Sequence, residues 1–358
     1  MRVKNCIVAA TLCCMVSCVS EDNYADEQPQ QIAFSPVVSN IRSRSPHLVQ
    51  RPPFGAYAWF GNSDQDLNTQ IYMNNVQIRE DAQGIWSPVD TYFWPSFGHL
   101  DFFCYSPYPE GKTSVRPKIT TSPYLVYNKL EYPEIKVDGN TPDFLYSDKT
   151  IFQSWETARK GVPIVFNHAL AKVVVTVTAT MLDEGEEGNT SWDLNLQEFT
   201  ISNVNHSGSL TMHLANDKKK WKKPMPAVWT KTPDAKEMWN LLPSDASQRK
   251  ITLETKVLKS AYVVPQILED DMKLHMKYEI ITHHHSGNVA DNKWSHELNL
   301  DLNSISSQTG PIGAWEMNKV ISYHILITPP SKKKPLIFRT EIEDWHSNSS
   351  VDEISPKE

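Results

Sequence analysis

The stretch of residues 161–180, GVPIVFNHALAKVVVTVTAT, limits the fold of this chain more than any other part of the sequence. Apolar residues occupy every second position in residues 162–166, which is the spacing of a strand with one buried face. β-Branched residues then dominate residues 173–178, and such residues favour strands. The four residues 169–172 between these runs are too few for a stable helix. The stretch therefore predicts two strands separated by a turn near residues 167–169, with the second strand partly buried on both faces.

Short apolar runs recur along the whole chain of 358 residues. Proline outnumbers glycine by 24 to 13, and 40% of the residues are hydrophobic, which is enough for substantial cores. Strand-forming runs between proline-marked loops are typical of an all-β fold, and the length suits two domains. We predict one short helix, in residues 229–242, with Ala235, Met238 and Trp239 on one side. The other strand candidates are residues 31–39, 54–60, 71–80, 92–105, 193–202, 209–214, 251–258, 260–265, 274–282, 294–302, 320–328 and 335–342.

The first 17 residues have the form of an export signal rather than of folded structure. A start with two basic residues precedes an apolar segment, residues 6–16, that is too short to span a membrane as a helix. The segment ends in a small residue followed by Cys18, which resembles the cleavage site of a bacterial lipoprotein signal. In such a signal the cysteine receives a diacylglycerol and becomes the new N-terminus. Cys18 is therefore the predicted lipidation site; the alternatives are Cys13, Cys14 or an ordinary secretory signal.

Cysteine usage agrees with export. The sequence has five cysteines, and after processing and lipidation at Cys18 the one free thiol would be that of Cys104. A single thiol cannot form an internal disulfide, so the stability of the mature protein must come from packed β cores. Cys104 lies in an apolar run and is predicted to be a small buried residue.

The segment after the signal contains the candidate processing sites. Residues 18–30 are polar and acidic, and we predict that they form a tether. The strand candidate 31–39 follows, and beyond it a hydrophilic, proline-flanked stretch carries Arg42, Arg44 and Arg51. Exposed arginines in such a stretch are sites where a trypsin-like protease cuts. Arg42, Arg44 and Arg51 are therefore candidate processing sites, and an uncut loop is the alternative.

Candidates for catalysis or metal binding are few. Asp143 and Asp148 could form a carboxylate pair, but turn formation is the better interpretation because no histidine is near them in sequence. His168 is predicted to pack at a strand junction rather than to act as a base. Three histidines at residues 283–285 are interpreted as a polar hairpin tip, because neighbouring strand residues point to opposite faces. The sequence also lacks the GxSxG, HExxH, P-loop and GxGxxG motifs, so we predict no catalytic residue, no metal site and no cofactor.

The charge pattern argues against nucleic acid as a partner. The net charge is −7, and no basic tract is long enough to suggest nucleic-acid binding. The basic run of residues 218–223, KKKWKK, is interpreted as a solvated hairpin loop, with a polyanion-binding patch as the alternative. Most of the 11 tryptophans lie in alternating strand runs and are predicted to be core residues.

The order of several segments resembles a known family. The first half contains WPSFGHLDFFCYSPYP, PDFLYSD and VPIVFNHALAKVVVTV, at residues 94–109, 142–148 and 162–177. The second half adds the segments at residues 196–210, 262–266, 313–329 and 342–345. In this succession, behind a lipoprotein signal, the chain resembles the fimbrillin-like (Mfa1-like) proteins of the Bacteroidetes, which are subunits and accessory components of type V pili.

The resemblance implies a fold and a way of assembling. The fold would be all-β, with two tandem transthyretin-like (Ig-like) β-sandwich domains at residues 31–160 and 161–345 and a tail at residues 346–358. The role would be structural rather than enzymatic. Assembly would work by β-strand addition: an arginine-directed protease removes the strand at residues 31–39, and the exposed groove accepts a strand from the next subunit. The implied partners are other fimbrial subunits and a host or bacterial surface ligand.

The resemblance also implies a location. Acidic Glu21 and Asp22 follow Cys18, as in the surface-export signal of Bacteroidetes lipoproteins. The chain would then be a surface-exposed protein of the cell outer membrane, held there by the lipid on Cys18, and part of a fimbrium.

The tail departs from what a polymerising subunit needs. Its large apolar residues are Val351 and Ile354, and their spacing of three does not suit one face of a donor strand. We therefore expect a tip, accessory or anchor protein rather than a shaft subunit. The alternative is a surface lipoprotein that binds a glycan or another ligand through exposed aromatics such as Trp221 and Trp229.

Overall fold

The structure of the chain, a computed structural model, is built almost entirely of β-strands. It describes residues 29–38, 52–62, 70–109, 118–120, 127–137, 141–147, 150–183, 188–215, 228–232, 234–285, 289–307, 310–329 and 336–344. Within these ranges the helical segments are two short 3-10 helices, Ala246–Arg249 and Leu302–Ser304. Neither has the length and apolar character that crossing a bilayer requires. The all-β class is thus confirmed, because the alternating and β-branched runs form strands.

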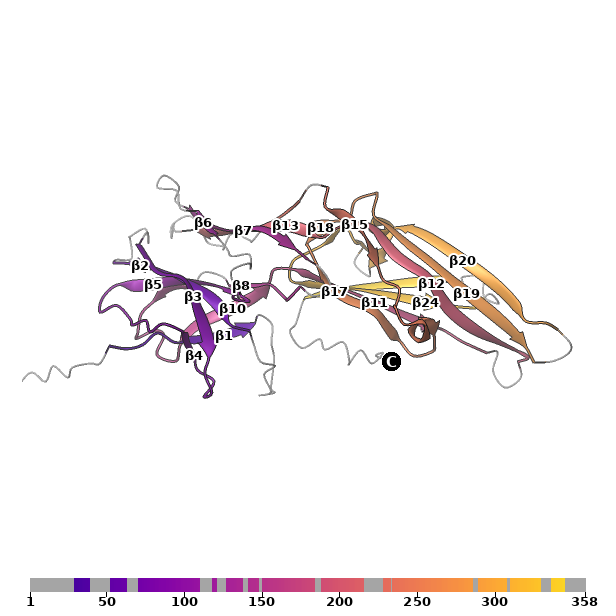
Figure 1. Ribbon diagram of the computed structural model, residues 1–358, viewed down its shortest axis with the longest axis horizontal. Helices are drawn as coiled ribbons and strands as arrows, with labels where there is room; N and C mark the ends of the chain where they lie inside the picture. The colour runs from indigo at the N-terminus through magenta and orange to yellow at the C-terminus, as the bar shows by residue number, and fades with distance from the viewer. Residues whose placement is uncertain are drawn as a thin grey trace, which may run out of the picture.

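The N-terminal part forms an eight-stranded sheet that we call the N-terminal ring. Its strands are β1 Phe34–Val38, β2 Phe54–Gly61, β3 Gln70–Glu80, β4 Trp86–Pro88, β5 His99–Ser106, β8 Leu145–Ser147, β9 Thr150–Gln153 and β10 Val162–His168. Their order is β2-β3-β4-β1-β10-β8-β5-β9, and a further pairing of β2 with β5 closes the sheet on itself (Figure 1). The inward side chains, among them Phe54, Phe102 and Ile164, form one hydrophobic core.

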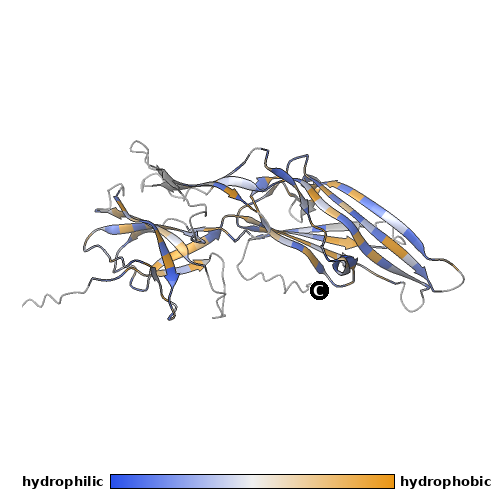
Figure 2. Cartoon of the chain, in the orientation of Figure 1, coloured by the Kyte–Doolittle hydropathy of each residue, from blue (hydrophilic) through white to orange (hydrophobic). Residues whose placement is uncertain are grey.

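Two facing sheets make up the C-terminal sandwich. One contains β11 Ala171–Ala179, β17 Lys256–Val263, β24 Lys319–Ile327 and β25 Leu336–Asp344, in the order β17-β11-β24-β25. The other contains β12 Thr190–Asn205, β15 Lys236–Asn240, β16 Lys250–Ile251, β19 Lys273–His284 and β20 Asn292–Asp301, in the order β15-β12-β19-β20, with β16 on β12. Their inner faces share one core, and hydrophilic and hydrophobic residues alternate along β12, β19 and β20 (Figure 2). This alternation is what a sheet with one solvated face requires.

A third sheet joins the two parts. It consists of β6 Lys118–Thr120, β7 Tyr127–Lys136, β13 Ser207–Ala215 and β14 Val228–Lys231, in the order β14-β13-β7-β6. The antiparallel pairing of β7 with β13 connects the N-terminal part of the chain to the C-terminal part. Two small sheets complete the described fold, β18 Gln266–Ile267 with β23 Ala314–Trp315, and β21 Ser306–Ser307 with β22 Gly310–Pro311.

A separate hydrophobic cluster, the junction cluster, lies where these sheets meet. Its buried members are Tyr57, Trp59, Phe103, Tyr105, Tyr132, Ile135, Val137, Ala169, Leu170, Val174, Leu210, Met212, Val264 and Val320. They come from the outer face of the N-terminal ring, from the joining sheet and the residue after β7, from β11 and β24, and from the connections at residues 169–170 and 264. The cluster therefore packs the N-terminal ring against the C-terminal sandwich.

The central stretch folds as the sequence predicts. β10 alternates buried and less buried residues, and β11 is buried on both faces over most of its length. The bend between them falls at residues 169–170. β10 belongs to the N-terminal ring and β11 to the C-terminal sandwich, so the stretch connects the two parts.

Sheet membership does not follow the predicted domain ranges of residues 31–160 and 161–345. β10 lies after residue 160 but pairs with β1 and β8 in the N-terminal ring. β7 lies before residue 160 but pairs with β13. The mixing arises because β7 extends across the junction, where it shares hydrophobic contacts with both parts. Sheet membership does not by itself define domains, so the boundary between two domains at residue 160 stays a prediction.

The predicted helix at residues 229–242 is wrong. The chain there forms β14 and β15, and both are edge strands. Met238 and Trp239 therefore point to opposite faces of β15, and 68% of the Met238 surface is exposed. The apolar residues favoured a helix by spacing, but pairing of β15 with β12 overrides this weak local preference.

Candidate functional site

The position of β1 is the feature of the fold most relevant to assembly. β1 pairs in parallel with β10 over its whole length, from Phe34 opposite Val162 to Val38 opposite Phe166. On its other side it pairs with β4 at one position, Phe34 opposite Trp86. β1 is therefore an interior strand of the N-terminal ring that is held fully on one side and weakly on the other.

Backbone hydrogen bonds extend this attachment before β1 begins. The amide of Ile32 donates to the carbonyl oxygen of Tyr92 at 2.8 Å, and the amide of Trp94 donates to the carbonyl oxygen of Gln30 at 2.8 Å. The amide of Val162 donates to Ala33 at the same distance. Residues 30–38 thus fill a strand-shaped slot, with β10 on one side and β4 together with residues 92–94 on the other.

The side chains of this segment alternate as the sequence predicts. Ile32 and Phe34 point into the core, and 4% of the Phe34 surface is exposed. The Phe34 ring lies edge-on to Phe54 and Phe102, with ring centroids 5.6 and 5.5 Å away. Val37 points outward and exposes 47% of its surface. Removing the segment would uncover apolar core surface and the unpaired edges of β4 and β10.

Gly161 shapes one wall of the slot. Its φ of 98° lies in the region that favours glycine, and an added Cβ would approach the carbonyl carbon of Phe34 to 2.9 Å. Glycine is required here because the chain turns into β10 while passing directly against the backbone of β1.

The predicted processing and anchoring residues lie outside the described residues. Arg42, Arg44 and Arg51 fall between β1 and β2 in the sequence, in a connection of which positions 39–51 are not described. Cys18 and most of the tether also lie outside, as do the tail at residues 346–358 and the basic run at residues 218–223. The last described strand, β25, pairs antiparallel with β24 and forms one edge of its sheet.

The structure brings together a pair that sequence reasoning missed. His168 is buried at the end of β10, as predicted for a junction residue, and its Nδ1 lies 2.7 Å from Oδ2 of Asp143. Burial lowers the pKa of nearby Lys172, against the attraction of Asp143, and raises the pKa of Tyr262. The two residues are 25 positions apart, and the sequence between them contains no motif that signals this contact. Asp148 lies outside the described residues.

The histidines at residues 283–285 lie at the end of the β19–β20 hairpin, as predicted. His283 contacts Asp291 at 2.7 Å and Asp193 at 3.3 Å, and these hydrogen bonds raise its pKa. His285 instead contacts Ser191. Across the part of the chain that is described, no three histidine, cysteine or acidic side chains gather as a metal site would need.

Trp221 and Trp229 are the two tryptophans that the sequence suggested as exposed ligand-binding residues. Trp229 packs against the junction cluster, and its indole Nε1 donates to the carbonyl oxygen of Ala169 at 2.5 Å. It is therefore a packing residue rather than an exposed platform. Trp221 lies outside the described residues.

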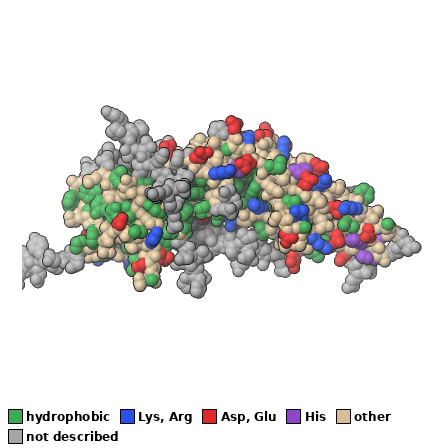
Figure 3. Space-filling model, in the orientation of Figure 1, with side chains coloured by type: hydrophobic (Ala, Val, Ile, Leu, Met, Phe, Trp, Pro, Cys, Tyr) green, Lys and Arg blue, Asp and Glu red, His purple; other side chains and the backbone are tan. Residues whose placement is uncertain are grey.

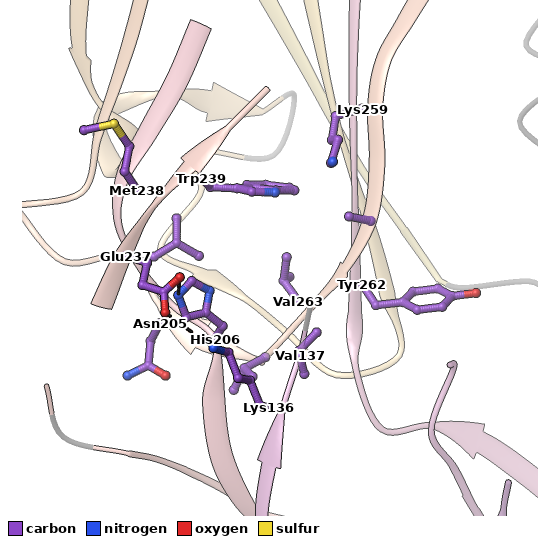
Figure 4. A pocket seen from close by; sticks show the side chains of 13 residues that line it. Lys136, Val137, Asn205, His206, Glu237, Met238, Trp239, Lys259, Tyr262 and Val263 are labelled. Carbon is purple, nitrogen blue, oxygen red and sulfur yellow. Dashed lines mark ion pairs between the residues drawn. The ribbon is translucent and has the colours of Figure 1, made fainter. Parts of the chain in front are cut away.

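A pocket of about 310 Å³ lies at the open side of the C-terminal sandwich, between the edge strands β15 and β17 (Figure 4). Trp239 forms one wall, Lys259 faces it from β17, and Lys136, His206 and Glu237 stand at one end. On the face seen in Figure 3, charged side chains gather over the C-terminal sandwich, whereas the N-terminal ring shows mostly hydrophobic and uncharged ones. Sequence reasoning missed this pocket because its walls belong to different sheets.

The chain was compared with protein families, with curated proteins and with solved structures. A family model described as fimbrillin-like matches residues 48–345. A search of curated proteins finds no match. A fimbrial protein from Bacteroides vulgatus has a similar fold, with a TM-score of 0.56, 14% identity, and coverage of 88% of this chain and 100% of that chain. A candidate cell adhesion protein from Bacteroides uniformis is 17% identical, with a TM-score of 0.47 and coverage of 88% and 99%.

Proposed function

The chain belongs to the fimbrillin-like family, and from this premise we propose that it is a structural or adhesive component of cell-surface fimbriae. It acts without catalysis. It is made as a lipoprotein precursor, anchored in the outer membrane through Cys18 and exposed at the cell surface. An arginine-directed protease cuts this precursor at Arg42, Arg44 or Arg51 and releases β1 together with the segment that carries the lipid on Cys18. The emptied slot then accepts a strand from another fimbrial subunit.

The observation that carries this proposal is the placement of β1. A strand in the interior of a sheet is ordinarily fixed on both sides, but β1 has a full ladder to β10 and one pair with β4. Its two core side chains, Ile32 and Phe34, fill positions that another strand with alternating apolar residues could fill. All three candidate arginines lie between β1 and β2 in the sequence, so each cut would separate β1 from β2.

The proposed position in the fimbrium is supported by the spacing of apolar residues in residues 346–358. A donor strand must present apolar side chains at every second position to fill the slot. The tail at residues 346–358 offers Val351 and Ile354 at a spacing of three. We therefore assign the chain to the tip, to an accessory role or to the anchor rather than to the shaft.

Incubation of the purified precursor with an arginine-specific protease tests the proposal. Mass spectrometry should find a new N-terminus after Arg42, Arg44 or Arg51. The cut chain should lose the released segment and then rebind a synthetic peptide of residues 29–39. A peptide with the Phe34→Ala substitution should bind at least tenfold more weakly, whereas a Val37→Ala peptide should bind like the parent.

Two arginine variants test which residues the protease cuts; the second is the matched control. A triple variant with lysine at positions 42, 44 and 51 should resist trimming, and an Arg79→Lys variant should be trimmed normally because Arg79 lies within β3. If the cut chain instead forms a series of oligomers of increasing size, the assignment to a tip, accessory or anchor position is overturned. Cutting that neither frees β1 nor creates a peptide-binding slot would overturn strand addition.

A surface lipoprotein that binds a glycan is the second candidate. One of its two proposed platforms is withdrawn, because Trp229 is occupied by packing and by its hydrogen bond to Ala169. The pocket beside Trp239 offers a different place for a ligand.

A further inference from the structure

The pocket between β15 and β17 combines an apolar interior with a charged rim. Its floor includes Val204, Val263 and Val264, which are buried in the fold and expose apolar atoms to the pocket. Such a combination, at a volume near the lower end of the range of about 300–1,000 Å³ seen for small-molecule sites, suits a compact ligand. The ligand needs one apolar face and polar groups around its edge.

Trp239 provides an aromatic wall in a fixed orientation. The indole packs edge-on against buried Trp315, with ring centroids 6.1 Å apart. In Figure 4 its ring projects into the middle of the pocket. Its Nε1 finds no hydrogen-bond partner among the described residues, so the donor is available to a ligand. A fixed indole face with a spare donor at its edge matches a pyranose ring, whose C–H groups form an apolar face and whose hydroxyls form a polar edge.

The charges around the pocket are unequally compensated. Glu237 contacts both Lys136, at 3.7 Å, and His206, at 3.1 Å. Lys259 stands on the opposite side, on edge strand β17, and makes no ion pair with a described carboxylate. Its ammonium group points toward Trp239 in Figure 4. One cation is thus left over beside the aromatic wall, and it favours a ligand with a negative charge.

We propose that this pocket binds an acidic saccharide. One sugar ring lies on the Trp239 indole, its carboxylate pairs with the Lys259 ammonium, and its hydroxyls reach the Nε1 of Trp239 and the groups at the Glu237 end. The pocket lies in the C-terminal sandwich, away from the slot that β1 fills. Ligand binding therefore goes beyond the proposed assembly role, and each can fail without the other.

Calorimetric titration of the full, uncut chain tests the inference with defined probes. Glucuronic acid and N-acetylneuraminic acid should bind, and glucose should bind at least tenfold more weakly because it lacks the carboxylate. Lys259→Met should weaken binding of the acidic sugars by about 10- to 100-fold, the loss expected for a charge-assisted hydrogen bond. Glucose binding should be unchanged by this variant.

Two further variants separate stacking from folding. Trp239→Ala should abolish saccharide binding, and Trp239→Phe should keep the packing against Trp315 and retain part of the affinity. The matched controls are Trp294→Ala, which removes a tryptophan that exposes 58% of its surface on β20, and Lys160→Met, which removes an exposed lysine before β10. Both controls should bind like the parent chain.

Several results would overturn the inference. Equal affinity for glucose and glucuronic acid would remove the role of Lys259. Inorganic sulfate that binds as tightly as the acidic sugars would remove the role of the ring. Absence of binding by either acidic sugar, or binding that survives Trp239→Ala and Lys259→Met together, would place no saccharide in this pocket.

Discussion

At the scale of single residues, an ionic cluster holds the corner where β14, β15 and the loop before β19 meet. Lys231 and Lys236 both contact Glu269, and Lys236 also lies 2.8 Å from Asp271. Hydrogen bonds from the two lysines lower the pKa of Glu269 to about 2. Hydrogen bonds to Asp271 and Glu269 raise the pKa of Lys236 to about 12. Because these groups are exposed, solvent screens their effect on stability, and the cluster mainly fixes local geometry.

The first prediction concerns the protonation of Glu269. Its pKa is below the ordinary 4.5, so its contribution to stability is present above pH 4.5 and is lost as the pH falls toward 2. In a Lys236→Met variant the pKa should rise toward 4.5, and the contribution should be lost at a higher pH. NMR titration of the Glu269 carboxyl carbon measures its pKa in the parent chain and in the variant. Lys277→Met, which removes one of the two cationic partners of Glu198 among the described residues, should leave the Glu269 titration unchanged.

The second prediction concerns the anchoring side chain of β1. Phe34→Ala should lower the free energy of unfolding of the chain by about 3–5 kcal/mol, the usual cost of removing a buried phenylalanine ring. Val37→Ala on the same strand should change it by less than about 0.5 kcal/mol, because Val37 is largely exposed. Urea unfolding of the uncut chain measures both. Equal losses in the two variants would contradict the assignment of Phe34 as the core anchor.

At the scale of elements, β1 and β10 form a parallel pair of strands that lie far apart in the sequence. Parallel pairing needs a long connection, and here the rest of the N-terminal ring provides it. The arrangement places β1 next to the turn before β10, where Gly161 touches the backbone of Phe34. The fit of β1 thus depends on the backbone of its neighbour as much as on its own side chains.

The third prediction follows from this contact. Gly161→Ala should destabilise the uncut chain by at least about 1 kcal/mol, because the positive φ disfavours a side chain and the new Cβ meets Phe34. It should also speed the loss of β1 after cutting. The control is Gly313→Ala, where a Cβ would meet nothing within 4 Å. Thermal unfolding and mass spectrometry of the released segment give the two readouts, and β1 release at the parent rate would contradict the contact.

At the scale of the whole molecule, the junction cluster couples the N-terminal ring to the C-terminal sandwich. Its side chains come from sheets on both sides, and Leu170 lies between β10 and β11, the strands that join the two parts. Burial of contiguous apolar surface between two parts favours their folding as one unit. A strand added at β1 would then be mechanically connected to the distant end of the molecule.

The fourth prediction tests this coupling. The parent chain should unfold in one calorimetric transition, and Leu170→Ala should separate the unfolding into two transitions by weakening the cluster. Leu194→Ala removes a comparable buried side chain from the core of the C-terminal sandwich alone. It should cost about 2–5 kcal/mol without first separating the two parts. Two transitions in the parent chain would show that the cluster does not couple them.

The sequence by itself determined the local structure of this protein. Alternation in residues 162–166 and 173–178 predicted β10 and β11, and alternation around Phe34 predicted β1 with its buried and exposed faces. These predictions succeed because the period of a strand is a property of neighbouring residues and needs no knowledge of partners. The helix expected at residues 229–242 failed because a weak helical spacing was outweighed by pairing with β12.

The tertiary structure alone decided which strands and side chains meet. The parallel pairing of β1 with β10, the contact of Asp143 with His168, and the pocket between Trp239 and Lys259 all join residues that are separated in sequence. No local pattern specifies such contacts, because pairing depends on the free energy of the whole arrangement of sheets and on the apolar surface it buries. For the same reason sheet membership does not change at residue 160: β7 pairs with β13 in the joining sheet, and β10 pairs with β1 and β8 in the N-terminal ring.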